Sequence, residues 1–203
     1  MTNPTNEKPL QFVICDANVV IMMAIFNGSK MLEEGSYSFG ELQIHDLAIE
    51  EIKRWRKSQA KLRKFGKDVI NSAITKAEAA GFSLGEMAAA ERTRFHSAIS
   101  NIENGLDTDD KGMATSPEDK EYIALALKHG CYLASQEDTI RSVALKMLPE
   151  KSKLLSFEDL IVDLFKSGQL TKQDILDGIG NLNHFRENFR RDQKFKVNKI
   201  LTQ

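Results

Sequence analysis

The segment FVICDAN, residues 12–18, runs four apolar residues directly into the carboxylate of Asp16. Polar and apolar residues do not alternate over residues 10–15, so a strand covered on both faces is expected there, as in a parallel sheet. A helix is expected to follow over about residues 18–27 and to end at Gly28. Asp16 stands between the two elements, where a carboxylate either caps the helix or holds a metal ion. The rest of the chain has to decide between these two interpretations.

Helix and strand patterns alternate along the remainder of the chain. Further strands are expected near residues 42–44, 131–135 and 153–156. Further helices are expected over residues 46–80 with a break at Gly66, 83–104, 117–129 and 137–148, and after the N-caps Ser156 and Thr171. This alternation predicts a three-layer α/β/α fold with a central parallel sheet of about four to five short strands.

The same pattern suggests how the chain is divided. We expect a disordered N-terminal lead (residues 1–10), a main domain (11–160), a helical pair inserted in that domain (about 57–115) and a helical C-terminal extension (161–203). The lead lacks the apolar core of a signal peptide, and the longest apolar run, residues 19–26, is too short to cross a membrane. The only two cysteines, Cys15 and Cys131, fit a reducing compartment without a disulfide framework. These features predict a cytoplasmic protein with no membrane partner.

Carboxylates follow the expected strands at the edge where helices begin. The candidates are Asp16, Glu51 beside Glu50, Asp119, and Glu137 beside Asp138. Each alone is explained by the preference of acidic residues for the first turn of a helix. Four converging carboxylates would raise one another's pKa, and a divalent cation bound by oxygen ligands removes that repulsion. Active sites of open parallel sheets lie at this edge, which favours the metal interpretation.

The local motifs around these acids resemble those of the PIN-domain nucleases. The first strand ends in Asp16-Ala17-Asn18, and the second acid is Glu51-Ile52, seven residues after the apolar Ile44. The third acid, Asp119, opens an alanine-rich helix that ends at Gly130 and is followed by the strand and by Ser135-Gln136-Glu137. The family has Thr-x-Asp at this last place, so either Glu137 fills it with a side chain one methylene longer and the metal geometry adjusts, or Asp138 substitutes for it.

The resemblance implies a metal-dependent endoribonuclease that hydrolyses phosphodiester bonds of RNA. Asp16, Glu51, Asp119 and Glu137 would be the catalytic acids and would hold Mg²⁺ or Mn²⁺, with Asn18 and Ser135 as positioning groups. The metal lowers the pKa of a water molecule near neutral pH, and the products would carry a 5′-phosphate and a 3′-hydroxyl. The family includes toxins held inactive by an antitoxin as well as RNA-processing nucleases. Either role is therefore expected, and a homodimer remains open.

A basic segment follows Glu51 in the same helical stretch. The net charge of the chain is −1, but residues 52–67 hold eight Lys or Arg and no acid. Such a stripe suits a polyanion bound on one face. The RNA-binding candidates are Lys53, Arg54, Arg56, Lys57, Lys61, Arg63 and Lys64. Trp55 lies within this segment and either stacks on a base or packs in the core.

Two other functions compete with the nuclease. A catalytically degraded module of the same fold would bind RNA or protein without cleaving, and its RNA binding would be indifferent to Mg²⁺. An unrelated signalling domain with a phosphorylatable Asp16 would need a lysine at the end of a late strand, and the strands expected at 131–135 and 153–156 do not end in one.

Overall fold

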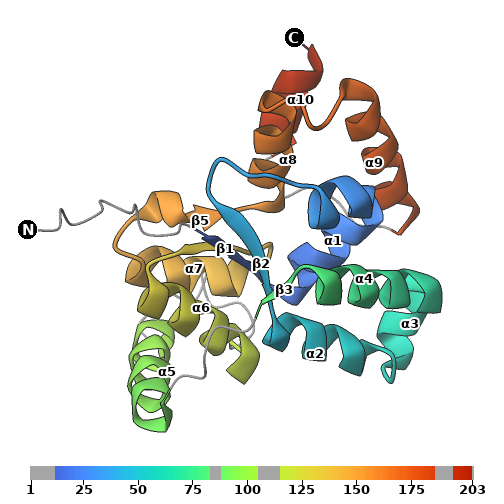
Figure 1. Ribbon diagram of the computed structural model, residues 1–203. Coiled ribbons are helices and arrows are strands. Elements are labelled where there is room, and N and C mark those ends of the chain that lie inside the picture. Colours follow the sequence, from blue (N-terminus) through green and yellow to red (C-terminus); the bar gives the residue numbers. More distant parts are fainter. Residues whose placement is uncertain (1–11, 83–87, 105–114, 186–193, 203) are drawn as a thin grey trace, which may run out of the picture.

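The computed structural model describes residues 12–82, 88–104, 115–185 and 194–202 (Figure 1). The expected N-terminal lead lies outside these residues. So do parts of the expected helical insertion and of the C-terminal extension. Within the described ranges, no helix combines the length and the hydropathy that a bilayer-spanning segment requires.

The fold is α/β, with helices on both faces of a parallel sheet, as the sequence predicts. Its strands are β1 (Phe12–Cys15), β2 (Glu41–His45), β3 (Gly81–Phe82), β4 (Tyr132–Ala134) and β5 (Leu154–Leu155). They form one sheet in the order β3-β2-β1-β4-β5, and every neighbouring pair is parallel. Burial of Val13, Ile14 and Cys15 on both faces of β1 explains why this central strand shows no alternation. The chain extends the sheet first to one side of β1 and then to the other.

The helices form two layers over this sheet (Figure 1). They are α1 (Ala17–Gly28), α2 (Asp46–Trp55), α3 (Gln59–Phe65), α4 (Lys67–Ala79), α5 (Ala89–Asn104), α6 (Pro117–His129), α7 (Asp138–Met147), α8 (Phe157–Lys166), α9 (Lys172–His184) and α10 (Lys194–Thr202). Short helical turns follow α1 (Ser29–Glu33) and precede β5 (Lys151–Lys153). One layer contains α1, which packs against α2, α4, α8 and α9; the other contains α5, α6 and α7, which pack against one another.

Hydrogen-bonded caps fix where the helices begin. Ser116 and Asp119, Ser156 and Asp159, and Thr171 and Asp174 form reciprocal capping boxes at the starts of α6, α8 and α9. At the other end of α6, Gly130 adopts a left-handed conformation with φ of 61°. These signals lie in the sequence itself, and the helices expected after Ser116, Ser156 and Thr171 are confirmed.

The region after β2 departs from the expected long helix. Gly66, with φ of 77°, separates α3 from α4 as the sequence predicts. A second break, at residues 56–58, separates α2 from α3. Ser58 caps the start of α3 by accepting a hydrogen bond from the backbone of Lys61. The two-residue strand β3 was also not expected, because so short a strand leaves no periodic pattern. The two buried cysteines are free thiols; Cys15 lies in β1 and Cys131 immediately precedes β4.

The C-terminal helices pack on the main sheet domain. Helix α9 lies along α1, and Gly178 is the point of closest approach, where an added Cβ would lie 2.6 Å from ring atoms of Phe26. Lys30 and Asp174 form an ion pair at 2.8 Å beside this contact. Helix α10 in turn packs on α8. The start of the C-terminal region therefore covers the helix that begins at the candidate site.

Two glycines of α9 give a test of this packing. Gly178→Ala should lower the free energy of unfolding by about 1–3 kcal/mol, because the new methyl group overlaps the Phe26 ring. Gly180→Ala is the matched control, because its Cβ meets nothing within 4 Å and should stabilise the helix by up to about 1 kcal/mol. Urea denaturation followed by circular dichroism measures both. Equal effects of the two substitutions would contradict the packing of α9 on α1.

Candidate functional site

The candidate site lies at the switch point of the sheet. Strands β1 and β4 are neighbours, and the sheet is extended from them in opposite directions, so this is the position at which ligands of open parallel sheets commonly bind. Asp16 follows β1 and its backbone N–H donates to the Ala134 carbonyl of β4 at 3.1 Å. Ser135 follows β4 and donates in the same way to Leu155 of β5 at 3.2 Å. The sheet thus fixes Asp16 and Ser135 side by side.

Asp16 is a buried carboxylate with one unused oxygen. Its Oδ1 accepts a hydrogen bond from the backbone of Val19 at 2.7 Å and so caps α1. The residue is only 2% exposed, and its Oδ2 is buried without a hydrogen-bond partner among the described residues. Burial raises the pKa of Asp16 to about 7; the Ser135 hydroxyl and the Val19 amide oppose the rise, whereas the charges of Glu137 and Glu51 add to it. Helix capping therefore accounts for the position of Oδ1 of Asp16 but not for the burial of Oδ2.

Glu137 lies in the loop after β4, next to Ser135 and bonded to the start of α1. Its carboxylate accepts a hydrogen bond from the Asn18 side chain, which lies two residues after Asp16. Its backbone N–H donates to the hydroxyl of Ser135 at 3.1 Å. Burial raises the pKa of Glu137, and the charge of Asp119 adds to this effect, whereas Lys61 and Asn18 oppose it. The loops after β1 and β4 are therefore joined through side chains as well as through the sheet.

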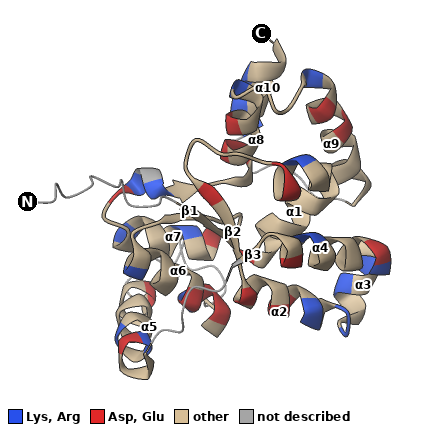
Figure 2. Cartoon of the chain, in the orientation of Figure 1, with Lys and Arg blue, Asp and Glu red and all other residues tan. Residues whose placement is uncertain are grey.

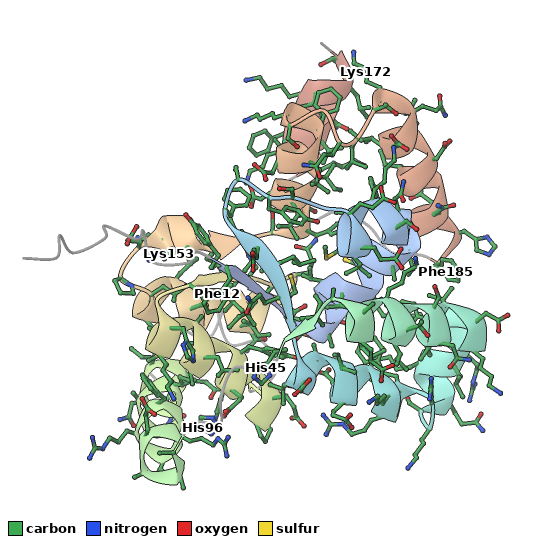
Figure 3. All side chains as sticks on the ribbon, in the orientation of Figure 1. Phe12, His45, His96, Lys153, Lys172 and Phe185 are labelled. Atoms are coloured by element: carbon green, nitrogen blue, oxygen red, sulfur yellow. The ribbon has the colours of Figure 1, made fainter. Side chains whose placement is uncertain are left out.

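Glu51 comes from α2, which begins directly after β2. His45 ends that strand, as labelled in Figure 3, and its ring nitrogen Nδ1 caps the helix by accepting from the backbone of Leu47 at 3.1 Å. The Glu51 carboxylate is half-buried and accepts a hydrogen bond from the hydroxyl of Tyr122 at 3.2 Å. Burial raises the pKa of Glu51 to about 7, the Tyr122 hydroxyl opposes the rise, and the charge of Asp119 is the largest charge that adds to it.

Asp119 stands at the third position of α6, where it also completes the capping box. Its Oδ2 accepts from the backbone of Ser116 at 2.8 Å. Burial raises the pKa of Asp119, and the hydrogen bonds from Ser116 oppose this. Its charge acts on Glu51 and on Glu137. Figure 2 shows acidic residues on the starts of both α2 and α6. We call the four residues Asp16, Glu51, Asp119 and Glu137 the acid cluster.

Tyr122 and the pair Arg54–Glu118 are site residues that the sequence motifs did not include. The Tyr122 side chain is fully buried between α6 and α2, and its own pKa is raised by burial and by the charges of Glu51 and Asp16. Arg54 of α2 donates to Glu118 of α6 at 2.7 Å. Both contacts tie α2 to the first turns of α6. The position of Tyr122, three residues after Asp119 and hence on the same helix face, was the available signal.

The seven basic candidates after Glu51 do not form one uniform surface. Lys53 pairs with Glu50 at 2.8 Å and with Glu78 at 3.0 Å, and Arg54 pairs with Glu118. The exposed members are Arg54, Arg56, Lys57, Arg63 and Lys64. Lys61 is half-buried, and its charge acts on Glu137. Arg54 and Lys61 are thus the two members with an electrostatic connection to the acid cluster.

The hypothesis that Trp55 stacks on a base is wrong. Trp55 is only 6% exposed, and its ring stacks on Phe65 with a centroid separation of 5.8 Å and an interplanar angle of 10°. The amino group of Lys61 lies 3.8 Å above the Trp55 ring centroid. Core packing, which the helical periodicity also allowed, is what the indole does.

The acid cluster has the chemistry of a divalent-cation site, although its side chains are held by the protein's own donors. In the described parts of the chain, no group of three or more His, Cys, Asp or Glu side chains is placed so that it could hold a metal ion. The buried Oδ2 of Asp16 lacks a donor, and burial raises the pKa of all four carboxyls. Oxygen ligands of this kind suit Mg²⁺ or Mn²⁺. The donor types of the acid cluster therefore suit such an ion, while the described side chains do not bring three of them together as its ligands.

Comparisons of the chain with protein-family models, with curated proteins and with solved structures give no match. The chemistry of the acid cluster therefore has to be inferred from its own geometry.

The raised pKa of Asp16 predicts a pH-dependent stability. The folded chain holds a proton on Asp16 up to about pH 7, whereas the unfolded chain releases it near pH 4, so the free energy of unfolding falls as pH rises through this window. The contribution of Asp16 alone reaches about 4 kcal/mol. Asp16→Asn keeps the cap on Val19 and should flatten the decline measured by urea denaturation at pH 5–8 with chelator present.

Asp174 is the control for this experiment. It also reaches back to cap a helix, but Lys30 and Thr171 lower its pKa to about 2. It is ionised throughout pH 5–8, so Asp174→Asn should leave the slope of stability against pH unchanged. Identical slopes for wild type and Asp16→Asn would show that Asp16 is not desolvated in solution.

Proposed function

We propose that the chain is a metal-dependent endoribonuclease that hydrolyses phosphodiester bonds of RNA, with a PIN-like arrangement of acids. One observation carries the proposal. Carboxylates from four separate segments lie around the switch point of a parallel sheet, and the most buried of them, Asp16, keeps an oxygen that has no hydrogen-bond partner among the described residues. Folding this arrangement without a cation costs free energy, because burial and mutual repulsion both disfavour the charged forms. A protein retains such a cluster when ion binding recovers that cost.

Asp16, Glu51, Asp119 and Glu137 are the residues that would hold Mg²⁺ or Mn²⁺. When bound, such an ion lowers the pKa of a water molecule and offsets the charge that develops on the phosphate. Asn18 and Ser135 orient the carboxylates of Glu137 and Asp16, and Tyr122 orients that of Glu51. In the described part of the chain, no Ser–His or Cys–His pair lies among these acids. The contribution of the chain's own residues is therefore to position the substrate and to neutralise its charge.

RNA is the proposed substrate, because the helix that carries Glu51 continues into the basic segment. Arg56, Lys57, Arg63 and Lys64 are exposed and would neutralise backbone phosphates beside the acid cluster. Each such contact makes binding weaker as salt rises. Whether the enzyme serves as the toxin of a toxin–antitoxin pair or in RNA processing, and whether it forms a homodimer, stays a prediction from the resemblance.

A second candidate is a module of this fold that binds RNA or protein without cleaving. Two of the four acids favour it, because Glu137 accepts from Asn18 and Asp119 accepts from Ser116. An ion has to replace or share these bonds. The two candidates differ in one measurable respect: RNA binding by a non-cleaving module would be the same with Mn²⁺ and with chelator.

Neighbouring residues of α2 provide a matched test of the nuclease. Purified protein should cleave single-stranded RNA with Mn²⁺ and not with chelator. Glu51→Gln should reduce the rate at least about 100-fold, because a ligand of the ion is lost. Glu50→Gln should change it little, since Glu50 is exposed and its ion pair with Lys53 contributes less than about 1 kcal/mol.

Asp16→Asn and Asp119→Asn should likewise abolish cleavage, with circular dichroism confirming that the variants fold. Cleavage that survives all three substitutions would eliminate the proposed mechanism.

The fourth acid is tested by the adjacent pair Glu137 and Asp138. Glu137 carries the side chain bonded to Asn18, whereas Asp138 is an exposed first residue of α7. Glu137→Gln should therefore lower Mn²⁺-dependent cleavage at least about 10-fold, and Asp138→Asn should leave it within about twofold. The reverse result would assign the fourth position to Asp138.

A further inference from the structure

A cavity of about 530 Å³ lies where α5 packs against α6, and none of its lining residues belongs to the acid cluster. Helix α6 contributes Pro117 and Lys120 to the lining. Helix α5 contributes two rows of side chains that repeat every four residues and therefore share one helix face: Arg92, His96 and Ser100, and Thr93, Ser97 and Asn101. Among the described residues that line the cavity, none is an acid. The lining is thus made mainly of cationic and hydrogen-bonding side chains.

The basic side chains from α5 are held by a carboxylate that does not line the cavity. Arg92 donates through Nε to Oε1 of Glu121 at 3.0 Å, and Nε2 of His96, labelled in Figure 3, lies 3.0 Å from Oε2 of the same residue. The Glu121 side chain is only 13% exposed, whereas that of Arg92 is 44% exposed. The pair uses the Nε–H of Arg92, and the other N–H groups of a guanidinium are on its two terminal nitrogens. Glu121 therefore fixes Arg92 and His96 from behind.

Lys120 is fixed in a similar way from the other helix. Its amino group donates to the Ser100 hydroxyl of α5 at 2.9 Å and lies 3.5 Å from Oε2 of Glu103. Glu103 is itself held, because it accepts a hydrogen bond from the backbone of Thr115 at 2.5 Å. An ammonium group has three donors, so these two contacts do not saturate Lys120. Cations from both helices are thereby positioned at one cavity.

The simplest structural interpretation is that these ion pairs tie α5 to α6. Partly exposed pairs of this kind contribute about 0–1 kcal/mol each, so they are a weak means of joining two helices. A joint of this kind also needs no open volume beside it. The volume of this cavity lies within the range of about 300–1,000 Å³ that is usual for small-ligand sites. Cations fixed by buried acids at such a cavity are what the recognition of an anion requires.

We propose that this cavity binds a small phosphorylated ligand of about the size of a nucleoside monophosphate. A phosphate monoester carries about −1.5 to −2 charges at pH 7 and has three acceptor oxygens. Arg92 and Lys120 would balance that charge, and the hydroxyls of Ser97 and Ser100 would donate to the remaining acceptors. A planar carboxylate has only two oxygens and uses fewer of these donors. The inference does not depend on the nuclease proposal, because it uses neither the acid cluster nor a metal ion.

Isothermal titration calorimetry of the full chain tests the proposal, with AMP, adenosine, inorganic phosphate and succinate as the probes. Chelator is present throughout, so that a metal ion at the acid cluster cannot hold the phosphate. AMP should bind with one-to-one stoichiometry, and inorganic phosphate should bind more weakly to the same site and compete with it. Adenosine and succinate should each bind at least about tenfold more weakly than AMP, because each lacks the charge-assisted hydrogen bonds of the phosphate.

Substitutions on the two helices locate the ligand. Arg92→Met and Lys120→Met should each weaken AMP binding at least about tenfold. Arg94→Met is the matched control, because Arg94 is exposed on the same helix without lining the cavity, and it should change the affinity less than about twofold. Urea denaturation checks that each variant is folded. Arg92→Gln, which retains a donor for Glu121, is the second variant if Arg92→Met is unstable.

Three results would overturn the inference. If neither AMP nor phosphate binds at millimolar concentration, the ion pairs serve only to join α5 and α6. If adenosine or succinate binds as tightly as AMP, the cavity does not recognise phosphate. If AMP binds equally well to the wild type and to the Arg92 and Lys120 variants, or is weakened equally by Arg94→Met, the ligand lies elsewhere.

Discussion

The desolvated carboxylate of Asp16 is the constraint on which the site depends. It follows the central strand β1 and caps α1, a helix in which most residues are buried, and it is itself only 2% exposed. One oxygen accepts a hydrogen bond from the backbone at the start of α1. The other has no hydrogen-bond partner among the described residues. Glu51 comes from the helix after β2 and Glu137 from the loop after β4, and the charges of both raise the pKa of Asp16 further. A buried carboxyl of this kind takes up a proton or pairs with a cation, because burial disfavours its charged form.

The helix caps and the acid cluster share the same residues. Asp16 caps α1, and Asp119 completes the capping box of α6, so the structural and the functional interpretation of each acid hold together. Capping directs one face of each carboxyl group to backbone N–H groups and thereby fixes its orientation. The directions of the carboxylate lone pairs that the caps leave unused are thereby fixed as well. The cap at the start of α1 holds the carboxylate of Asp16, and the capping box at the start of α6 holds that of Asp119.

Much of the fold could be predicted from local signals. The capping boxes at Ser116, Ser156 and Thr171 and the glycines at 66 and 130 act within a few residues, so the sequence alone reveals them. The break at residues 56–58 could not be predicted in this way, because it is set by the stacking of Trp55 on Phe65, which brings α3 back onto α2. The acids could be found by counting from strand ends. The contacts that orient them, from Tyr122 and Asn18, join residues 71 and 119 positions apart, and local patterns do not report such distances.

The burial of α1 has a consequence for how the protein is made. Nearly every side chain of this helix is covered, and one of its faces is covered by α9, whose Asn181 side chain donates to the Phe26 carbonyl across 155 positions. During synthesis, that apolar face stays open until residues 172–184 have left the ribosome. A nascent chain that ends before α9 therefore exposes part of the apolar surface of α1, which is the kind of surface that chaperones bind.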